Sequence, residues 1–209
     1  MMSFMSAYAA PQEYTLNPKG SNLYVTVYKN EKTLLSAAAH NHAIRAKNIT
    51  SSLQWDPENI SACKINISFN VSDLEVDSPQ SRSLAASKEK DTEIRKGFEK
   101  TISDSDRKAV RKNMLSKGQI NGGVHKTISF ASNSCTEKSI TGDFTLRGVT
   151  KSITMPARIK VNNEGKIKFS IKGSFPLSST DFGFKPYSDL GGAVANKAGM
   201  KVHVNLKAN

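Results

Sequence analysis

Two histidines close together are the residues of this chain whose type and spacing suggest chemistry most directly. His40 and His42 lie two positions apart, and on a β-strand this spacing places both imidazole rings on the same face. Two such rings can share a metal ion, but the sequence places no third ligand, such as His125, Cys135 or a carboxylate, beside them. We therefore predict no metal site and interpret the pair as contacts for a ligand head group or for buried carbonyl groups.

Other catalytic patterns do not stand out. The sequence shows no ordered Ser, His and Asp set, no paired carboxylates and no glycine-rich phosphate loop, and Gly191-Gly192 belongs to a loop rather than to a strand-turn-helix unit. A general acid or base needs a perturbed environment and a partner within reach, and the sequence indicates neither. We predict a protein that is not an enzyme, with no catalytic residues and no cofactor.

The charge balance restricts the class of partner. Lys and Arg number 30 against 18 Asp and Glu, a net charge of +12, which favours nucleic acid, anionic lipid or phosphorylated ligands. Aromatic residues are only 7%, and no basic stripe alternates with stacking rings as in single-strand binders, so we expect no nucleic acid. The basic segment 95–117 is the candidate for peripheral contact with an anionic membrane surface, and no stretch reaches the roughly 18 apolar residues of a membrane helix.

The elements that must position these residues are mainly strands. Apolar and polar residues alternate through 140–175, and this period of two indicates strands with one face on an apolar interior. Long alternating strands joined by short turns are typical of an antiparallel sheet closed into a barrel. We expect strands at 22–29, 33–46, 48–55, 61–73, 126–133, 138–147, 149–161, 165–175 and 199–208, with a loop over 176–197.

The alternation stops in the charged segment 79–120. Ser103 or Asp104 can cap a helix near 104–117, which ends at Gly118, and a second helix is expected near 87–100. Both would lie at the rim of the barrel, as a helical excursion within one domain of residues 19–209. An exposed strand edge or this helical segment would support a homodimer.

Residues 1–18 lack periodicity and are predicted to be a disordered tail. Ala7-Tyr8-Ala9 followed by Ala10-Pro11 is similar to the end of a secretory signal, without its charged and apolar parts. We interpret it as a truncated signal peptide and expect an exported, periplasmic protein.

The apolar phase of the strands defines a candidate binding site. A barrel lined in this way either fills itself or encloses an apolar ligand, and the many large inward residues favour a ligand. The predicted lining is Ile65, Ile67, Phe69, Phe144, Leu146, Ile153, Met155, Phe169, Ile171, Phe175, Val202 and Val204.

Cys63 and Cys135 are the two cysteines of the chain. Their spacing matches neither a zinc ribbon nor a redox pair. Cys63 is expected to point inward as a small apolar residue, and Cys135 falls in a polar turn. A disulfide between them would require an oxidising compartment, and the sequence leaves this open.

Four segments in order resemble a known family. They are Ala39-His-Asn-His42, the stretch Arg111-Lys-Asn-Met-Leu115 before Val124 to Ser132, the hairpin Thr141-Gly-Asp-Phe-Thr-Leu-Arg-Gly-Val-Thr-Lys151, and Ser179-Thr-Asp-Phe-Gly-Phe184. Together they resemble the YceI-like family of polyisoprenoid-binding proteins from about residue 20 to 207. Two departures are His125-Lys126 in place of an aromatic-proline pair, and a longer region around 80–105.

The resemblance implies an extended, lipocalin-like, eight-stranded antiparallel barrel with an apolar tunnel. The tunnel would hold an isoprenoid lipid, such as a polyprenyl or quinone-type tail, so that the protein acts as an exported carrier or store. His40, His42 and Arg147 are the candidates for head-group contacts. Two alternatives stay open: a metal-dependent or redox enzyme using His40 and His42, and an interaction protein with a filled barrel whose basic rim binds an acidic partner.

Overall fold

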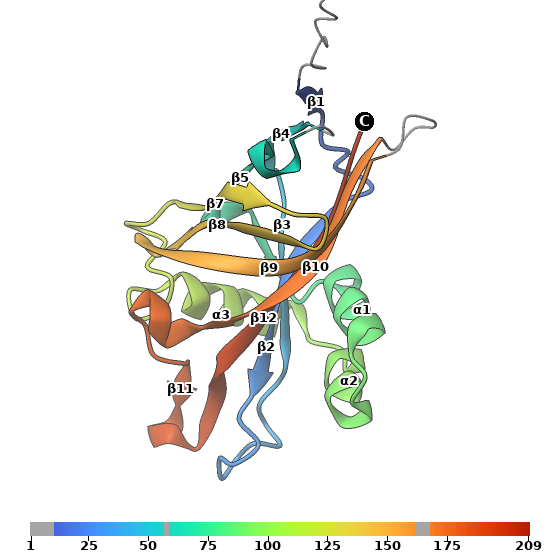
Figure 1. The fold of residues 1–209 in the computed structure, drawn as a ribbon. Coiled ribbons are helices and arrows are strands. Elements are labelled where there is room, and N and C mark those ends of the chain that lie inside the picture. The colour runs from blue at the N-terminus through green and yellow to red at the C-terminus, as the bar shows by residue number, and fades with distance from the viewer. Residues whose placement is uncertain (1–10, 57–58, 162–167) are drawn as a thin grey trace, which may run out of the picture.

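The computed structural model describes residues 11–56, 59–161 and 168–209, and it consists mainly of one strongly curled antiparallel sheet (Figure 1). The described residues form a 12-stranded sheet whose two ends do not pair with each other. The strands follow the order β1 (Gln12–Tyr14), β4 (Thr50–Trp55), β5 (Lys64–Asn70), β7 (Thr127–Cys135), β8 (Ser139–Leu146), β9 (Val149–Val161), β10 (Phe169–Ser178), β12 (Val194–Ala208), β2 (Asn22–Lys29), β3 (His42–Ala46) and β6 (Leu74–Val76), and β11 (Ser188–Asp189) pairs with β12.

The predicted all-β, barrel-like fold is confirmed, but the strand count exceeds the expected eight. Three of the additional strands, β1, β6 and β11, are only two or three residues long. A strand of two or three residues is too short for alternation of apolar and polar residues to reveal it. The predicted strand at 61–73 ends at Asn70, and a 3₁₀ turn (Val71–Asp73) separates it from β6. The predicted loop over 176–197 is shortened at both ends, because β10 runs to Ser178 and β12 begins at Val194.

The strand predicted over residues 33–46 is wrong in its first half. Backbone hydrogen bonds between residues three apart, such as Ser36 N to Thr33 O (3.1 Å) and Ala39 N to Ser36 O (3.2 Å), fold residues 31–38 into consecutive turns. Alanine and serine have little preference for strands, so local hydrogen bonds prevail there. Only His42–Ala46 extends as β3, and His40 lies outside it.

The segment just before β2 is ordered, contrary to the expectation of a disordered tail over 1–18. Tyr14 in β1 is buried, and Thr15 exchanges backbone hydrogen bonds with Asn209 (3.1 and 2.9 Å). This segment therefore joins β4 to the end of β12. The proposed signal remnant Ala7-Tyr8-Ala9 lies outside the described residues.

Three α-helices interrupt the strands of the described chain: α1 (Pro79–Lys88), α2 (Thr92–Glu99) and α3 (Asp104–Leu115). The predictions near 87–100 and 104–117 correspond to α2 and α3, whereas α1 was not predicted. Its start carries a clear signal, since Ser78 Oγ accepts a hydrogen bond from Ser81 N (3.2 Å) and Pro79 occupies the first turn. None of these helices is long and apolar enough to span a membrane.

Helices α1 and α2 cover the outer face of the sheet rather than its rim (Figure 1). Tyr24 from β2 and Ala43 from β3 pack there against Ala85 of α1 and Phe98 of α2. Strict alternation along β12 would turn His203 toward solvent on this side. Instead its ring stacks on Tyr24 at 4.6 Å between centroids, and burial followed by the charge of Lys201 lowers its pKa to about 4.

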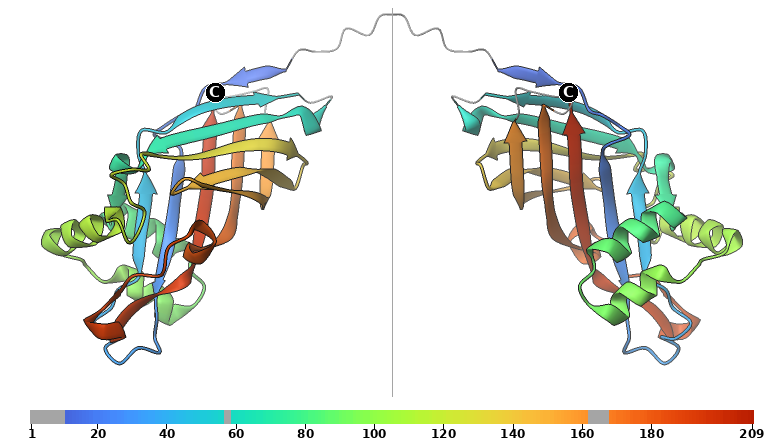
Figure 2. Two further views of the ribbon diagram at one scale, coloured as in Figure 1. Left: turned by 90° about the vertical axis from the view of Figure 1, so that its left-hand side faces the viewer. Right: turned by 90° about the vertical axis from the view of Figure 1, so that its right-hand side faces the viewer.

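Two glycines allow the sheet to curl. A Cβ atom on Gly142 would lie 2.4 Å from Ala131 O, and one on Gly173 would lie 2.4 Å from Pro156 O. No larger residue tolerates such an approach of neighbouring backbones. A side chain at either position would push two neighbouring strands of the sheet apart. The strands of this sheet cross one another in Figure 2.

A disulfide joins Cys63 and Cys135, with 5.9 Å between their Cα atoms. It connects the residue before β5 to the last residue of β7. Both cysteines are buried in the main core, which settles the possibility that the sequence left open.

Candidate functional site

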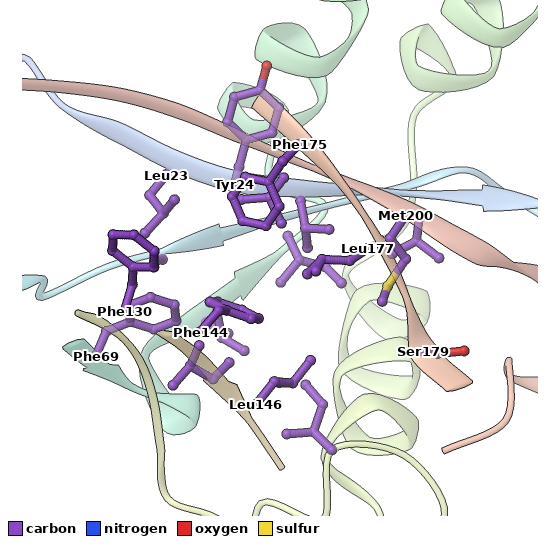
Figure 3. Close-up of a pocket in the computed structure, with 18 of the residues that line it drawn as sticks. Leu23, Tyr24, Phe69, Phe130, Phe144, Leu146, Phe175, Leu177, Ser179 and Met200 are labelled. Carbon is purple, nitrogen blue, oxygen red and sulfur yellow. The ribbon is translucent and has the colours of Figure 1, made fainter. Parts of the chain in front are cut away.

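The inner face of the curled sheet encloses a long apolar cavity (Figure 3). The volume of this cavity is about 220 Å³. Of the twelve predicted lining residues, all except Phe169 line it. These are Ile65, Ile67, Phe69, Phe144, Leu146, Ile153, Met155, Ile171, Phe175, Val202 and Val204.

The register of β10, β12, β2 and β3 arranges the lining in layers. Leu177 pairs with Met200, which pairs with Val27, which pairs with His42. Two residues further along each strand, the next layer contains Phe175, Val202, Val25 and Ile44. Alternate residues share a face, so the apolar phase read from the sequence is the phase that faces the cavity.

Aromatic side chains close one end of the cavity. Phe169 is 1% exposed. Its ring stacks on Tyr14 at 4.9 Å and lies 6.0 Å from Trp55. The prediction placed Phe169 in the tunnel wall, but the structure places it in this closure, because Tyr14 of the unexpected strand β1 covers it.

Polar side chains gather at the opposite end. Asn196 and Leu206 both line the cavity and lie ten residues apart on β12, which at roughly 3.3 Å per residue corresponds to about 30 Å. Around Asn196 the lining changes from apolar to polar side chains. We call this region the polar end, and its residues are Asn113, Gln119, Ser179, Tyr187, Asn196 and Lys197.

Hydrogen bonds order most of the polar end. Asn113 Nδ2 donates to Tyr187 Oη (3.0 Å), and Gln119 Nε2 donates to Lys185 O (3.2 Å). Ser179 differs: it is 2% exposed and its Oγ has no hydrogen-bond partner among the described residues. An unsatisfied buried hydroxyl costs about 1–3 kcal/mol, so this group is available to a polar ligand atom.

His42 lines the cavity and is held by a buried carboxylate. Its Nδ1 lies 2.7 Å from Asp77 Oδ2, and Asp77 Oδ1 accepts hydrogen bonds from Ala43 N (2.9 Å) and Arg82 (2.9 Å). Burial alone would raise the pKa of Asp77, but the hydrogen bond from His42, with Ala43 and Arg82, holds this pKa below its usual value. An ionised carboxylate only accepts, so Nδ1 carries the proton and Nε2 is the atom left for a ligand.

Asp77 and Arg82 were not predicted from the sequence. Arg82 also donates to Asn41 O (2.8 Å), Gly97 O (2.6 Å) and Lys100 O (2.9 Å). It thus ties α1 and α2 to the segment that precedes β3. The sequence does show an acidic residue between a short apolar run and the Ser78-Pro79 helix start. It gives no sign, however, that this residue pairs with a histidine far upstream.

His40 lies near His42, but it precedes β3 and is not among the residues that line the cavity. The ring centroids are 6.4 Å apart, and burial, followed by the charges of His42 and Arg82, lowers the pKa of His40. In the described residues no group of three His, Cys, Asp or Glu side chains is arranged to hold a metal ion.

Arg147, the third predicted head-group contact, is engaged by the backbone. It donates to Gln119 O (2.8 Å), Gly183 O (2.9 Å) and Lys117 O (3.3 Å). The structure does not bring it together with His40 and His42. It instead connects the β8–β9 turn to the loops that build the polar end.

The basic segment 95–117 is partly neutralised by its own acids. Arg95 pairs with Glu99 (3.8 Å), Lys96 pairs with Glu93 (2.8 Å) and Arg107 contacts Asp104. The inner side of α3 supplies Val110, Asn113 and Met114 to the cavity wall. Its contact with an anionic membrane stays a prediction.

An antiparallel sheet curled around one apolar cavity defines the class of lipocalin-like barrel proteins. Within that class the chain belongs to the YceI-like family, because residues 14–209 match the profile described as YceI-like domain. A search of curated proteins returned no match.

Solved structures show the same fold. The crystal structure of Burkholderia cenocepacia BcnA is similar with a TM-score of 0.62 at 10% identity, covering 93% of this chain and 100% of that one. A polyisoprenoid binding domain from Saccharophagus degradans, implicated in plant cell wall breakdown, gives a TM-score of 0.54 at 8% identity, with coverage of 94% and 97%.

Proposed function

We propose that this protein binds one long isoprenoid chain in its cavity and acts as an exported, periplasmic carrier or store. The observation that carries the proposal is the long apolar cavity of about 220 Å³, closed by aromatic rings at one end and polar at the other. Membership of the YceI-like family and the polyisoprenoid binding domain among similar structures support the choice of ligand.

The two ends of the cavity give the chain a direction. The apolar tail would lie toward Phe169, where aromatic rings close the cavity, and the head group would lie at the polar end. Ser179 Oγ and His42 Nε2 would meet an oxygen-bearing head group there. Each buried CH₂ contributes about 0.8 kcal/mol, so the tail supplies most of the affinity and the polar end supplies selectivity.

Export is supported by the disulfide between Cys63 and Cys135. Disulfides form and persist in oxidising compartments such as the bacterial periplasm. The open apolar cavity argues against the filled-barrel alternative.

Mass spectrometry of an organic extract tests the proposal. Protein purified from its native host should release one isoprenoid species in near-stoichiometric amount. Leu146→Arg, which puts a charge into the cavity wall, should release none, while the matched surface variant Thr145→Arg should release as much as the wild type. Repeated native preparations without isoprenoid, or equal release from all three proteins, would refute it.

The predicted head-group contact has its own test. Ser179→Ala should keep binding of a saturated hydrocarbon chain unchanged and should weaken binding of an isoprenoid alcohol or quinone. Equal affinity of Ser179→Ala and wild type for the polar ligands would show that the head group does not reach Ser179.

A further inference from the structure

Two loops next to the polar end expose leucines. Leu34 is 88% exposed and Leu35 43%, both in the β2–β3 connection, and Leu190 is 65% exposed after β11. Solitary exposed leucines are common. Here three exposed leucines lie on two adjoining loops, and exposed apolar side chains gathered at one end of a molecule indicate a binding surface.

The two loops are one structural unit. Asn30 N donates to Ala195 O (2.8 Å), Leu35 N donates to Ala193 O (2.8 Å), and Lys197 Nζ pairs with Glu31 Oε2 (2.7 Å). Figures 1 and 2 both show the loops side by side at the end of the molecule remote from the C-terminus. We call residues 30–39 together with 188–195 the tip.

The tip adjoins the polar end of the cavity. Tyr187 and Asn196, which flank its second loop, both line the cavity, as does Lys197. A lipid that leaves the cavity past these residues therefore emerges beside the exposed leucines.

The charges at the tip are complementary to an anionic surface. With its flanking residues, 29–39 and 185–197, the tip contains Lys29, Lys32, Lys185 and Lys197 against the two carboxylates of Glu31 and Asp189, a net charge of +2. Glu31 pairs with Lys197. Lys32 in the tip and Lys185 beside it are exposed. Exposed leucines with a surplus of lysines beside them are a combination that binds an interface of anionic lipid.

We propose that the tip docks on an anionic phospholipid bilayer, with Leu34, Leu35 and Leu190 entering the interface, so that the cavity exchanges its chain directly with the membrane. The lysines at and beside the tip, rather than segment 95–117, then provide the electrostatic attraction. Membrane docking is a separate property from the proposed isoprenoid binding. Because docking is measured without isoprenoid, a negative result would refute docking and leave the proposed function untouched, and the reverse also holds.

Vesicle flotation with the full chain tests the docking. The wild type should float with vesicles of phosphatidylcholine and phosphatidylglycerol in equal parts, less with pure phosphatidylcholine, and less in high salt. The double variant Leu34→Ser with Leu190→Ser should bind at least about tenfold more weakly, because each leucine loses its apolar burial. Val124→Ser, which removes a side chain 68% exposed outside the tip, should bind like the wild type.

Two further measurements complete the test. Lys32→Glu should weaken binding to the anionic vesicles and reduce its salt dependence. Urea unfolding, followed by Trp55 fluorescence, should give the wild-type midpoint for each variant and so establish intact folding. Failure of the wild type to bind anionic vesicles, or equal binding of the leucine double variant, would overturn the proposal. Concentration-dependent dimerisation that the same double variant abolishes would assign the tip to a second copy of the chain and would overturn it as well.

Discussion

Removal of the disulfide should destabilise the protein by an amount that the structure specifies. Cys63 and Cys135 are separated by 72 positions. In the chain-entropy description, closing a loop of this size in the unfolded chain stabilises the native state by about 4 kcal/mol. Both sulfurs are buried in the core, so the double variant Cys63→Ser with Cys135→Ser should lose this amount and the burial of two apolar groups as well.

Urea unfolding followed by tryptophan fluorescence measures this loss. Trp55 is the single tryptophan of the chain, is buried, and lies at the closed end beside Phe169. With a slope of about 3 kcal/mol per molar urea, a loss of about 4 kcal/mol lowers the midpoint by roughly 1.3 M. Reduction of the wild type should reproduce most of the shift, while reductant should leave the double variant unchanged.

Two results would refute this reasoning. One is a midpoint that reduction leaves unchanged. The other is a count of two free thiols in protein made in an oxidising compartment. The second result would also remove the support that the disulfide gives to export.

The remaining predictions concern single side chains. Leu146→Arg should abolish lipid retention or cost several kcal/mol, because a charge is buried unpaired, whereas Thr145→Arg should stay within about 0.5 kcal/mol; urea unfolding and extraction of both variants compare them, and an inverted outcome would show that the strand phase is wrong. Asp77→Asn should cost about 3 kcal/mol, because Arg82 loses the charge of its buried partner; a change below about 1 kcal/mol would contradict an ionised Asp77. His203 has a folded pKa of about 4 against 6.5 unfolded, so the unfolded chain binds the proton first and stability should fall as the pH drops from 6.5 to 4; His203→Gln should show a smaller fall in melting temperature over that range, and an identical fall would rule His203 out.

The strand phase could be predicted because burial on one face imposes a period of two over long segments. Leu146, Ile171 and Val202 all face the cavity as the alternation requires. Phe169 has the same phase, but its position in the closure depends on Tyr14, which is distant in sequence and belongs to a strand of three residues.

The errors arise where local or long-range contacts override the pattern. The apparent strand at 33–46 failed because turns with local hydrogen bonds compete well where side chains are small. His42 could be nominated from its spacing with His40, but its partner Asp77 is 35 positions away. No periodicity specifies such a contact, and the tip likewise joins loops that only the fold brings together.

The close approach of backbones at Gly142 and Gly173 has a consequence for how this scaffold can change. At two positions without a side chain, a Cβ atom would collide with the carbonyl oxygen of the neighbouring strand. Substitutions of the wall residues leave these two backbone approaches in place, so they alter the interior without forcing the strands apart there. A designer could resize the interior through residues such as Ile171 or Phe175, while either glycine replaced by alanine would deform the frame itself.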